Sequence, residues 1–303
     1  MTKRKIKFVR DDLTLVGDLF TPEGFDETGQ YQAVIVQGSF SSVKELMPGT
    51  YAQKFADQGF VALAFDYAHY GESAGEPRQL ESPAEKLKDL QAAVTYLTAL
   101  PYVQAVGMVG VCTSAGNAAY LGAAEPRLKA LATVAAFLPS PATFTMLYGG
   151  DEGVAARKAH AAASRGKYEQ TGEVDLVPAY SETDQSAINY GPAGSYDYYL
   201  NESRANIPAY RNETALMSLT EFLEFDPVSQ APAITAPTMV VHSDESAFPD
   251  QAKKLHEGIQ GEKELVWADG NHYDYYDSPA QIDNAVANVS RFFRTHLVAK
   301  PAA

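Results

Sequence analysis

The sequence predicts an α/β protein built on a mostly parallel sheet with helices on both faces. Short, wholly apolar runs alternate with helical segments in the first half and the last quarter of the chain, which is typical of strands covered on both faces. The 303 residues, 46% of them hydrophobic, suffice for one large domain with a substantial core. The only cysteine excludes an internal disulfide and a zinc site made of several cysteines.

The net charge and the lengths of the apolar runs argue against some classes of partner and location. The 24 basic and 38 acidic side chains give a net charge of −14, whereas nucleic acids and anionic membranes attract basic surfaces. The basic start of the chain is not followed by the roughly 7–15 apolar residues of a signal peptide, and no apolar run reaches the ~20 residues that span a bilayer. We therefore expect a cytoplasmic protein that binds neither nucleic acid nor membrane. The sequence is compatible with a homo-oligomer.

The first elements are predicted to be a β-hairpin and two buried strands with a helix between them. The hairpin joins residues 6–10 to residues 13–20 through a tight turn. The apolar runs at 33–36 and 61–65 are typical of strands in a parallel sheet, and residues 44–58 have the composition of a helix.

The next predicted helix begins with the residues that are typical of a helix N-terminus. Ser82 is a capping residue, Pro83 occupies the first helical position, and Glu85 lies three residues after the cap. Apolar side chains then recur at helical spacing, at Leu87, Leu90, Val94 and Leu97. The elements predicted to follow are a strand at 106–111, a helix at 113–124 and a strand at 128–136.

Residues 139–225 show no pattern of alternating strands and helices. This tyrosine-rich stretch has aromatic area to pack, so we interpret it as a cap, an insertion with helices of its own that covers one end of the sheet. Alternation resumes with strands at 238–241 and 264–267 around a helix at 249–259, and a final helix opens at Ser278. The predicted core therefore comprises residues 1–138 and 226–303.

The most informative segment is the end of the strand at 106–111. The strand leads directly into Cys112 and then into a helix, and small residues lie two before (Gly110) and two after (Ser114). A sharp strand–turn–helix needs such small neighbours, and it exposes a nucleophile at a helix N-terminus. Cys112 is therefore the candidate nucleophile. A competing frame, small-x-Ser-x-Gly, would make Ser114 the nucleophile.

A thiol nucleophile needs a base, and His272 is the best placed of the six histidines. It lies in a glycine-containing loop directly after the strand at 264–267, at the carboxyl edge where ligands gather in parallel sheets. His69, in a loop after the strand at 61–65, is its main rival.

The acid that would orient the base should follow another strand at the same edge of the sheet. Asp244 and Glu245 lie just past the strand at 238–241. Neighbouring side chains there point different ways, so we assign Asp244, with Glu245 as the alternative. The order nucleophile, acid, base is that of the α/β-hydrolase fold.

Several segments resemble the dienelactone hydrolase group of α/β hydrolases over nearly the full chain. Residues 110–114 (Gly-Val-Cys-Thr-Ser) resemble the cysteine elbow of that group, and residues 38–45 resemble a His-Pro-Gly-Gly-Gly-Val-Lys-Glu stretch of related bacterial enzymes. Residues 66–75 resemble an Asp-x-Arg-Gly-x-Gly-x-Ser-x-Gly loop, and residues 271–277 an Asn-His-x-Asp-x-Tyr-Asp end. The chain departs from the group at Gly38, Ser39, Ala68 and His69, which border the expected pocket.

The resemblance implies an eight-stranded sheet and an oxyanion hole formed by the backbone N–H groups of Phe40 and Thr113. We expect Phe40, His69 and Tyr198 to contact a small-molecule acyl substrate. The implied reaction is hydrolysis of an ester, lactone or thioester through an acyl-enzyme on Cys112, without a cofactor or metal. Two alternatives stay open: an acyltransferase that uses the same acyl-cysteine, and a ligand-binding protein on a hydrolase scaffold.

Overall fold

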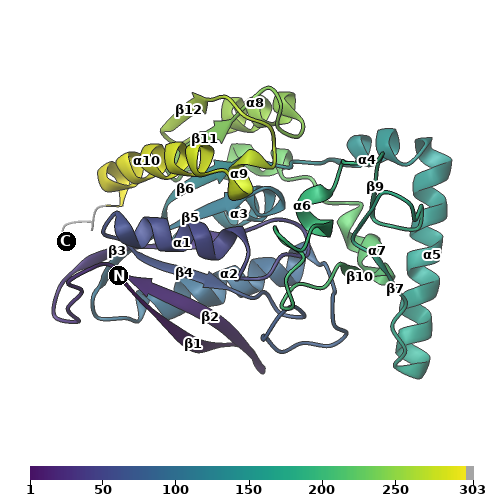
Figure 1. Cartoon of the computed structure of the whole chain (residues 1–303), viewed down its shortest axis with the longest axis horizontal. Coiled ribbons are helices and arrows are strands. Elements are labelled where there is room, and N and C mark those ends of the chain that lie inside the picture. Colours follow the sequence, from purple (N-terminus) through teal and green to yellow (C-terminus); the bar gives the residue numbers. More distant parts are fainter. Residues whose placement is uncertain (298–303) are drawn as a thin grey trace.

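The computed structural model describes residues 1–297 and places eight strands in one twisted sheet (Figure 1). The order across the sheet is β1-β2-β4-β3-β5-β6-β11-β12, and all pairs beyond β4 are parallel. This confirms the predicted fold class. The strands are β1 (Thr2–Arg10), β2 (Leu13–Thr21), β3 (Tyr31–Gln37), β4 (Val61–Phe65), β5 (Val103–Val111), β6 (Leu128–Val134), β11 (Thr238–His242) and β12 (Lys263–Trp267).

Helices cover both faces of the sheet, and this explains why its strands are apolar throughout. Along β3, Val34 and Val36 belong to one core, whereas Ala33 and Ile35 belong to the other. The first core is closed by α1 (Met47–Asp57) and α10 (Pro279–His296), and the second by α2 (Pro83–Thr98), α3 (Thr113–Ala124) and α8 (Pro249–Gly258).

The predicted hairpin and the predicted strands and helices of the core are confirmed, with shifted boundaries: β1 begins at residue 2 rather than 6, β5 begins at 103 rather than 106, and β6 ends at 134 rather than 136. The helix predicted over 44–58 begins at Met47, because Pro48 is tolerated only in a first turn. Lys44, which lies before this turn, points inward, and its Nζ lies 2.8 Å from Oδ2 of Asp66.

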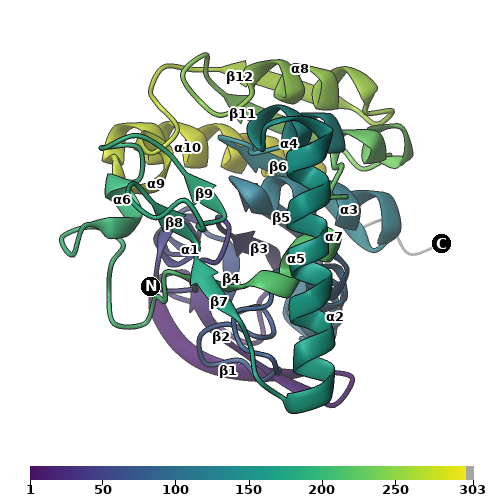
Figure 2. The same ribbon diagram turned by 90° about the vertical axis from the view of Figure 1, so that its right-hand side faces the viewer.

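Segment 139–225 contributes no strand to the large sheet. We expected helices there, and it contains α4 (Pro141–Leu147), α5 (Gly150–Thr171), α6 (Asp197–Leu200), the 3-10 turn η1 (Leu216–Ser218) and α7 (Leu219–Phe222). It also contains four short strands in two small sheets, namely β7 (Leu176–Pro178), β8 (Tyr180–Ser181), β9 (Asn189–Tyr190) and β10 (Glu213–Ala215). Figure 2 shows the long helix α5 standing in front of the end of the sheet. Strands of two or three residues are too short to leave a periodic pattern.

Two features complete the description of residues 1–297. A 3-10 helix, η2 (Val228–Ala233), and a short helix, α9 (Asp274–Asp277), occupy loops of the core. Among these residues, no helix has the length and apolar character needed to cross a membrane. The predicted core range ends at residue 303, and its last six positions lie outside the described residues.

Candidate active site

Cys112 lies at the predicted strand-to-helix turn, between β5 and α3. Its backbone has φ of 56° and ψ of −121°, a conformation that is strained for a residue with a side chain. Gly110 is required two positions earlier, because a Cβ there would lie 2.1 Å from the carbonyl oxygen of Ser114. The turn thus holds the sulfur above the carboxyl edge of the sheet.

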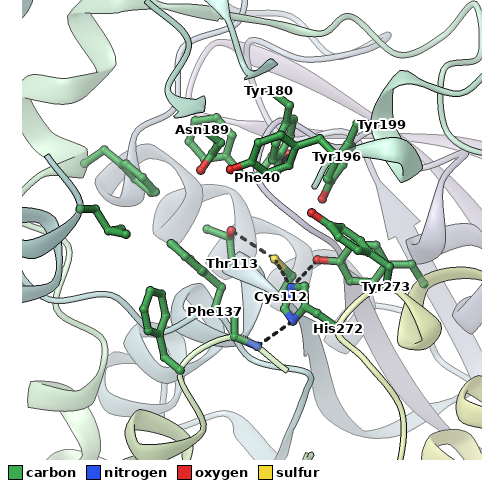
Figure 3. A pocket seen from close by; sticks show the side chains of 15 residues that line it. Phe40, Cys112, Thr113, Phe137, Tyr180, Asn189, Tyr196, Tyr199, His272 and Tyr273 are labelled. Atoms are coloured by element: carbon green, nitrogen blue, oxygen red, sulfur yellow. Dashed lines mark hydrogen bonds between the residues drawn. The ribbon is translucent and has the colours of Figure 1, made fainter. Parts of the chain in front are cut away.

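His272 meets this sulfur from the loop after β12 (Figure 3). Tyr276, from α9, contacts the same histidine. Nε2 of His272 lies 3.4 Å from Sγ of Cys112 and 2.8 Å from the hydroxyl of Tyr276. The structure therefore brings together the predicted nucleophile and the predicted base, and adds a phenol that the sequence analysis did not single out. Tyr276 occupies the tyrosine position of the Asn-His-x-Asp-x-Tyr-Asp pattern at residues 271–277, which could have identified it.

The other ring nitrogen of His272 faces a backbone donor rather than a carboxylate. The N–H of Ala247 donates to Nδ1 at 3.2 Å. A nitrogen that accepts a hydrogen bond carries no proton, so the neutral ring holds its proton on Nε2, the nitrogen that faces Cys112. An orienting acid would instead hold the proton on Nδ1.

The assignment of Asp244 as the orienting acid is therefore not supported by the geometry. Asp244 and Glu245 are exposed, and within residues 1–297 neither forms a hydrogen bond with His272. The physical reason lies in the turn after β11. Ser243 points inward, where its hydroxyl bonds to the carbonyl of Gly270 at 2.6 Å and to Ser246 at 2.8 Å, so the two residues after it face solvent.

The electrostatic surroundings keep both reactive groups neutral. Burial raises the pKa of the Cys112 thiol, and hydrogen bonds from Tyr276, from Thr113 and from the backbone N–H of Phe40 act in the opposite direction. Burial, together with the neighbouring His242, lowers the pKa of His272 to about 3. The two residues whose backbone N–H groups are expected to form an oxyanion hole, Phe40 and Thr113, are thus among the groups that lower the pKa of the thiol, and both line the cavity in front of it.

Ser114, the competing nucleophile, lies behind the turn. It is fully buried, its backbone N–H donates to the carbonyl of Gly38 at 3.1 Å, and its hydroxyl lies 3.3 Å from the hydroxyl of Tyr67. It does not line the cavity in front of Cys112. This geometry favours Cys112 over Ser114.

Two residues expected to contact substrate lie elsewhere. His69 is buried in the loop after β4, where its Nδ1 is 3.0 Å from the carbonyl oxygen of Pro77, and it does not line the cavity. Its loop is drawn inward by Asp66, whose carboxylate accepts the N–H of Glu72. Tyr198 packs behind the cavity wall, with its ring centroid 4.9 Å from that of Tyr276. Phe40 does line the cavity.

The cavity in front of Cys112 has a volume of about 240 Å³, and nine of its fifteen lining residues are Phe or Tyr. Tyr180, Tyr196, Tyr199 and Phe222 come from segment 139–225, and Phe137 and Phe248 come from loops of the core. Sequence reasoning missed these residues because the elements that carry them are short or irregular.

A group of carboxylates outside this cavity does not form a metal site. Glu45, Asp66 and Glu72 converge, but the ammonium of Lys44 lies among them, 2.6 to 2.8 Å from an oxygen of each. A cation of the protein thus fills the position that a metal ion would take.

Comparison with known proteins places the chain in a family. Residues 17–146 match the sequence profile of the Dienelactone hydrolase family. The whole chain is similar to YcjY, an uncharacterized protein of Escherichia coli strain K12, with 31% identity over 310 residues that cover 98% of this chain and 100% of that protein. The chain belongs to the dienelactone hydrolase family. This membership supports hydrolase activity.

Other relatives of this dienelactone hydrolase family member carry functional names. A thiohydrolase of Aspergillus aculeatus is 24% identical, with 90% of this chain and 87% of that protein covered. An acyltransferase of Aspergillus calidoustus is 24% identical, with coverage of 80% and 79%. The crystal structure of an α/β hydrolase from Penicillium sp. sh18 superposes with a TM-score of 0.83 at 20% identity and covers 98% of this chain and 99% of its own. The fold is that of the α/β hydrolases.

Proposed function

We propose that this family member hydrolyses an ester, lactone or thioester through an acyl-enzyme intermediate on Cys112. The observation that carries the proposal is the position of the thiol. It lies at a strained turn, 3.4 Å from Nε2 of His272, and the backbone N–H groups of Phe40 and Thr113 act to lower its pKa. Acyl transfer requires at least a nucleophile and hydrogen-bond donors that stabilise the oxyanion beside it.

In the proposed reaction the Cys112 thiol first releases its proton to solvent. The Nε2–H of His272 donates to the hydroxyl of Tyr276 at 2.8 Å, and this hydroxyl donates in turn to the thiolate. Nε2 itself lies 3.4 Å from the sulfur. The sulfur attacks the carbonyl carbon, an S–C bond forms, and the carbonyl π electrons move onto oxygen, where the two N–H groups stabilise them. Each such donor is typically worth ~3 kcal/mol. The bond to the leaving group then breaks, and the leaving group takes up a proton from solvent.

Hydrolysis of the acyl-enzyme completes the cycle. Water adds to the thioester carbonyl and gives its proton to solvent, and the S–C bond breaks to regenerate the thiolate. His272 acts as a hydrogen-bond donor in this scheme rather than as a base, because Ala247 holds the proton of the neutral ring on Nε2. Within residues 1–297, deacylation therefore lacks a general base. Acylation likewise lacks a general acid for the leaving group in this scheme, so substrates with good leaving groups, above all thioesters, are favoured.

The test compares Cys112→Ala with Ser114→Ala on p-nitrophenyl esters and on short-chain acyl thioesters. Cys112→Ala is expected to lose at least ~1,000-fold in kcat/KM, whereas Ser114→Ala stays within a few-fold of the parent. Activity that survives in Cys112→Ala contradicts the proposal. A parent protein that turns over none of these substrates, and whose Cys112 resists iodoacetamide, indicates a binding protein on a hydrolase scaffold.

A second candidate function is acyl transfer to an amine or thiol. Within residues 1–297, no base is placed to activate water at the acyl-enzyme. Amines and thiols are stronger nucleophiles than water and need less help from a base, so this geometry favours acyl transfer to them. The acyltransferase name of one relative agrees with it. Product analysis with and without added amine or thiol separates the two, because a transferase accumulates the amide or exchanged thioester in place of the free acid.

A further inference from the structure

The walls of the cavity are made of ring faces and edges rather than of aliphatic side chains. On one side, Tyr180 stacks on Tyr199 with ring centroids 3.7 Å apart and planes at 7°. On another, the rings of Phe137 and Phe248 lie with centroids 5.4 Å apart, and both residues line the same cavity. Leu147 is the only long aliphatic side chain among the lining residues. Aromatic walls favour a planar aromatic guest, which gains stacking and edge contacts beyond its buried area.

The hydroxyl of Tyr199 is a polar atom without a partner in this wall. The side chain is 1% exposed, and within residues 1–297 its oxygen makes no contact with hydrogen-bond geometry, although the hydroxyls of Ser39 and Tyr180 are near enough to influence its pKa. Figure 3 shows the labelled side chain reaching toward the space around Cys112. A buried hydroxyl without a hydrogen bond is costly, so such a group at a binding cavity points to a ligand that supplies the missing partner.

A second polar group faces the same space from segment 139–225. Nδ2 of Asn189 donates to the carbonyl oxygen of Ala179 at 3.0 Å, and the oxygen of its amide is turned to the cavity (Figure 3). Tyr199 and Asn189 thus offer a hydroxyl and an amide oxygen, which together suit a hydroxyl on the guest. A quaternary ammonium group also suits an aromatic cage, but it would leave both of these groups without a hydrogen bond.

The size of the cavity limits the guest. About 240 Å³ is slightly below the ~300–1,000 Å³ of pockets that hold drug-sized ligands. It suits an aromatic system of one or two fused rings. Apart from the neutral His272, no ionisable Asp, Glu, Lys, Arg or His side chain lines it, so nothing there would pair with a charged acyl chain.

We propose that the acyl group loaded onto Cys112 is an aromatic group of one or two rings that carries a ring hydroxyl, and that this hydroxyl bonds to Tyr199. The inference rests on the proposed function and specifies its substrate class. The carbonyl carbon lies at the sulfur, and the ring extends between Tyr199 and Phe137. Tyr199 is a specificity residue in this arrangement, and the chemistry at Cys112 is unchanged by it.

The experiment measures kcat/KM for three thioesters with the same leaving group, in which the acyl group is hydroxynaphthoyl, naphthoyl or an unbranched aliphatic chain of similar volume. The parent protein should prefer the two aryl substrates over the aliphatic one by about tenfold. It should also prefer hydroxynaphthoyl over naphthoyl by about three- to tenfold, as expected for one neutral hydrogen bond. Tyr199→Phe should remove the preference for the hydroxyl, so that the ratio of the two aryl substrates approaches one.

Tyr190→Phe is the matched control, because Tyr190 belongs to the same segment but is 47% exposed and does not line the cavity. It should leave the ratio unchanged, and thermal unfolding should show that both variants are folded. An equal or better rate with the aliphatic substrate overturns the substrate class, and an unchanged ratio in Tyr199→Phe overturns the role of Tyr199. Cys112→Ala tests the proposed function separately. If this variant loses activity on all three substrates, the proposed function stands whichever substrate is preferred. If it keeps these activities, the proposed function is overturned.

Discussion

Two groups of buried polar side chains in this hydrolase have opposite characters. The ion-pair cluster lies around the loop after β4 and consists of oppositely charged partners that are all less than one-tenth exposed: Lys44 with Asp66, Lys86 with Glu81, and Arg10 with Asp89. The thiol cluster lies after β5 and β12 and consists of Cys112, His272 and Tyr276, which are all kept neutral at physiological pH by burial.

The comparison explains why charge is present in one cluster and absent from the other. The carboxylate of Asp66 accepts the N–H of Lys44 at 2.9 Å as well as its ammonium, and it thereby fixes two loops beside the sheet. A carboxylate beside His272 would hold the ring in another tautomer and stabilise its charged form. The ion-pair cluster therefore determines loop structure, whereas the thiol cluster remains neutral and chemically available.

The largest expected effect concerns stability and the ion-pair cluster. Lys86→Met leaves Glu81 buried without its cation and should lower the free energy of unfolding by about 3–5 kcal/mol, measured by urea denaturation. Lys88→Met is the matched control on the same helix, because Lys88 is 52% exposed and its pair with Glu85 should contribute less than about 1 kcal/mol. An equal decrease in the free energy of unfolding in the two variants would show that burial of the ion pair does not increase its contribution to stability.

The next effect is the pH dependence of thiol reactivity. Burial raises the pKa of Cys112, so the thiolate fraction is small at neutral pH and increases as pH rises. The rate of alkylation by iodoacetamide should therefore increase roughly tenfold per pH unit between about pH 6 and 8.5. A plateau at neutral pH would reveal a thiolate–imidazolium pair and would contradict the neutral cluster.

A smaller effect is expected from the phenol that contacts both partners. Tyr276→Phe removes the hydroxyl that lies 2.8 Å from Nε2 of His272 and that donates to the sulfur. We expect kcat/KM to fall about tenfold and the alkylation profile to shift to higher pH, because the thiolate loses a donor. A lower kcat/KM without a shift of the profile would indicate a packing role only.

The smallest effect distinguishes this cluster from a triad. Asp244→Asn and Glu245→Gln should each leave kcat/KM within about twofold of the parent, because both side chains are exposed and neither bonds to His272. Loss of an orienting acid in a Ser–His–Asp triad costs ~10,000-fold. A loss of that order in either variant would restore the acid that the sequence analysis assigned.

Particular residues show how far the sequence could predict this molecule. The doubly covered strands and the turn at Cys112 follow from short-range patterns, namely apolar runs and the small neighbours Gly110 and Ser114. That neither Asp244 nor Glu245 bonds to His272 within residues 1–297 could not be predicted, because it depends on Ser243 turning inward by contacts with a distant loop. Tyr199 could not be predicted either, since its segment reaches the cavity through elements of only a few residues.

The most direct test of the account is the mass of the protein during turnover. Deacylation without a general base should be slow, so rapid mixing with a hydroxynaphthoyl thioester and an acid quench should accumulate one acyl group per chain. We predict that peptide mapping places this group on Cys112 and that Cys112→Ala shows none. Two results would contradict an acyl-enzyme on Cys112. In the first, the parent protein releases the aryl acid but the acyl group is found on another residue. In the second, it releases the acid and no acyl group is found at any quench time.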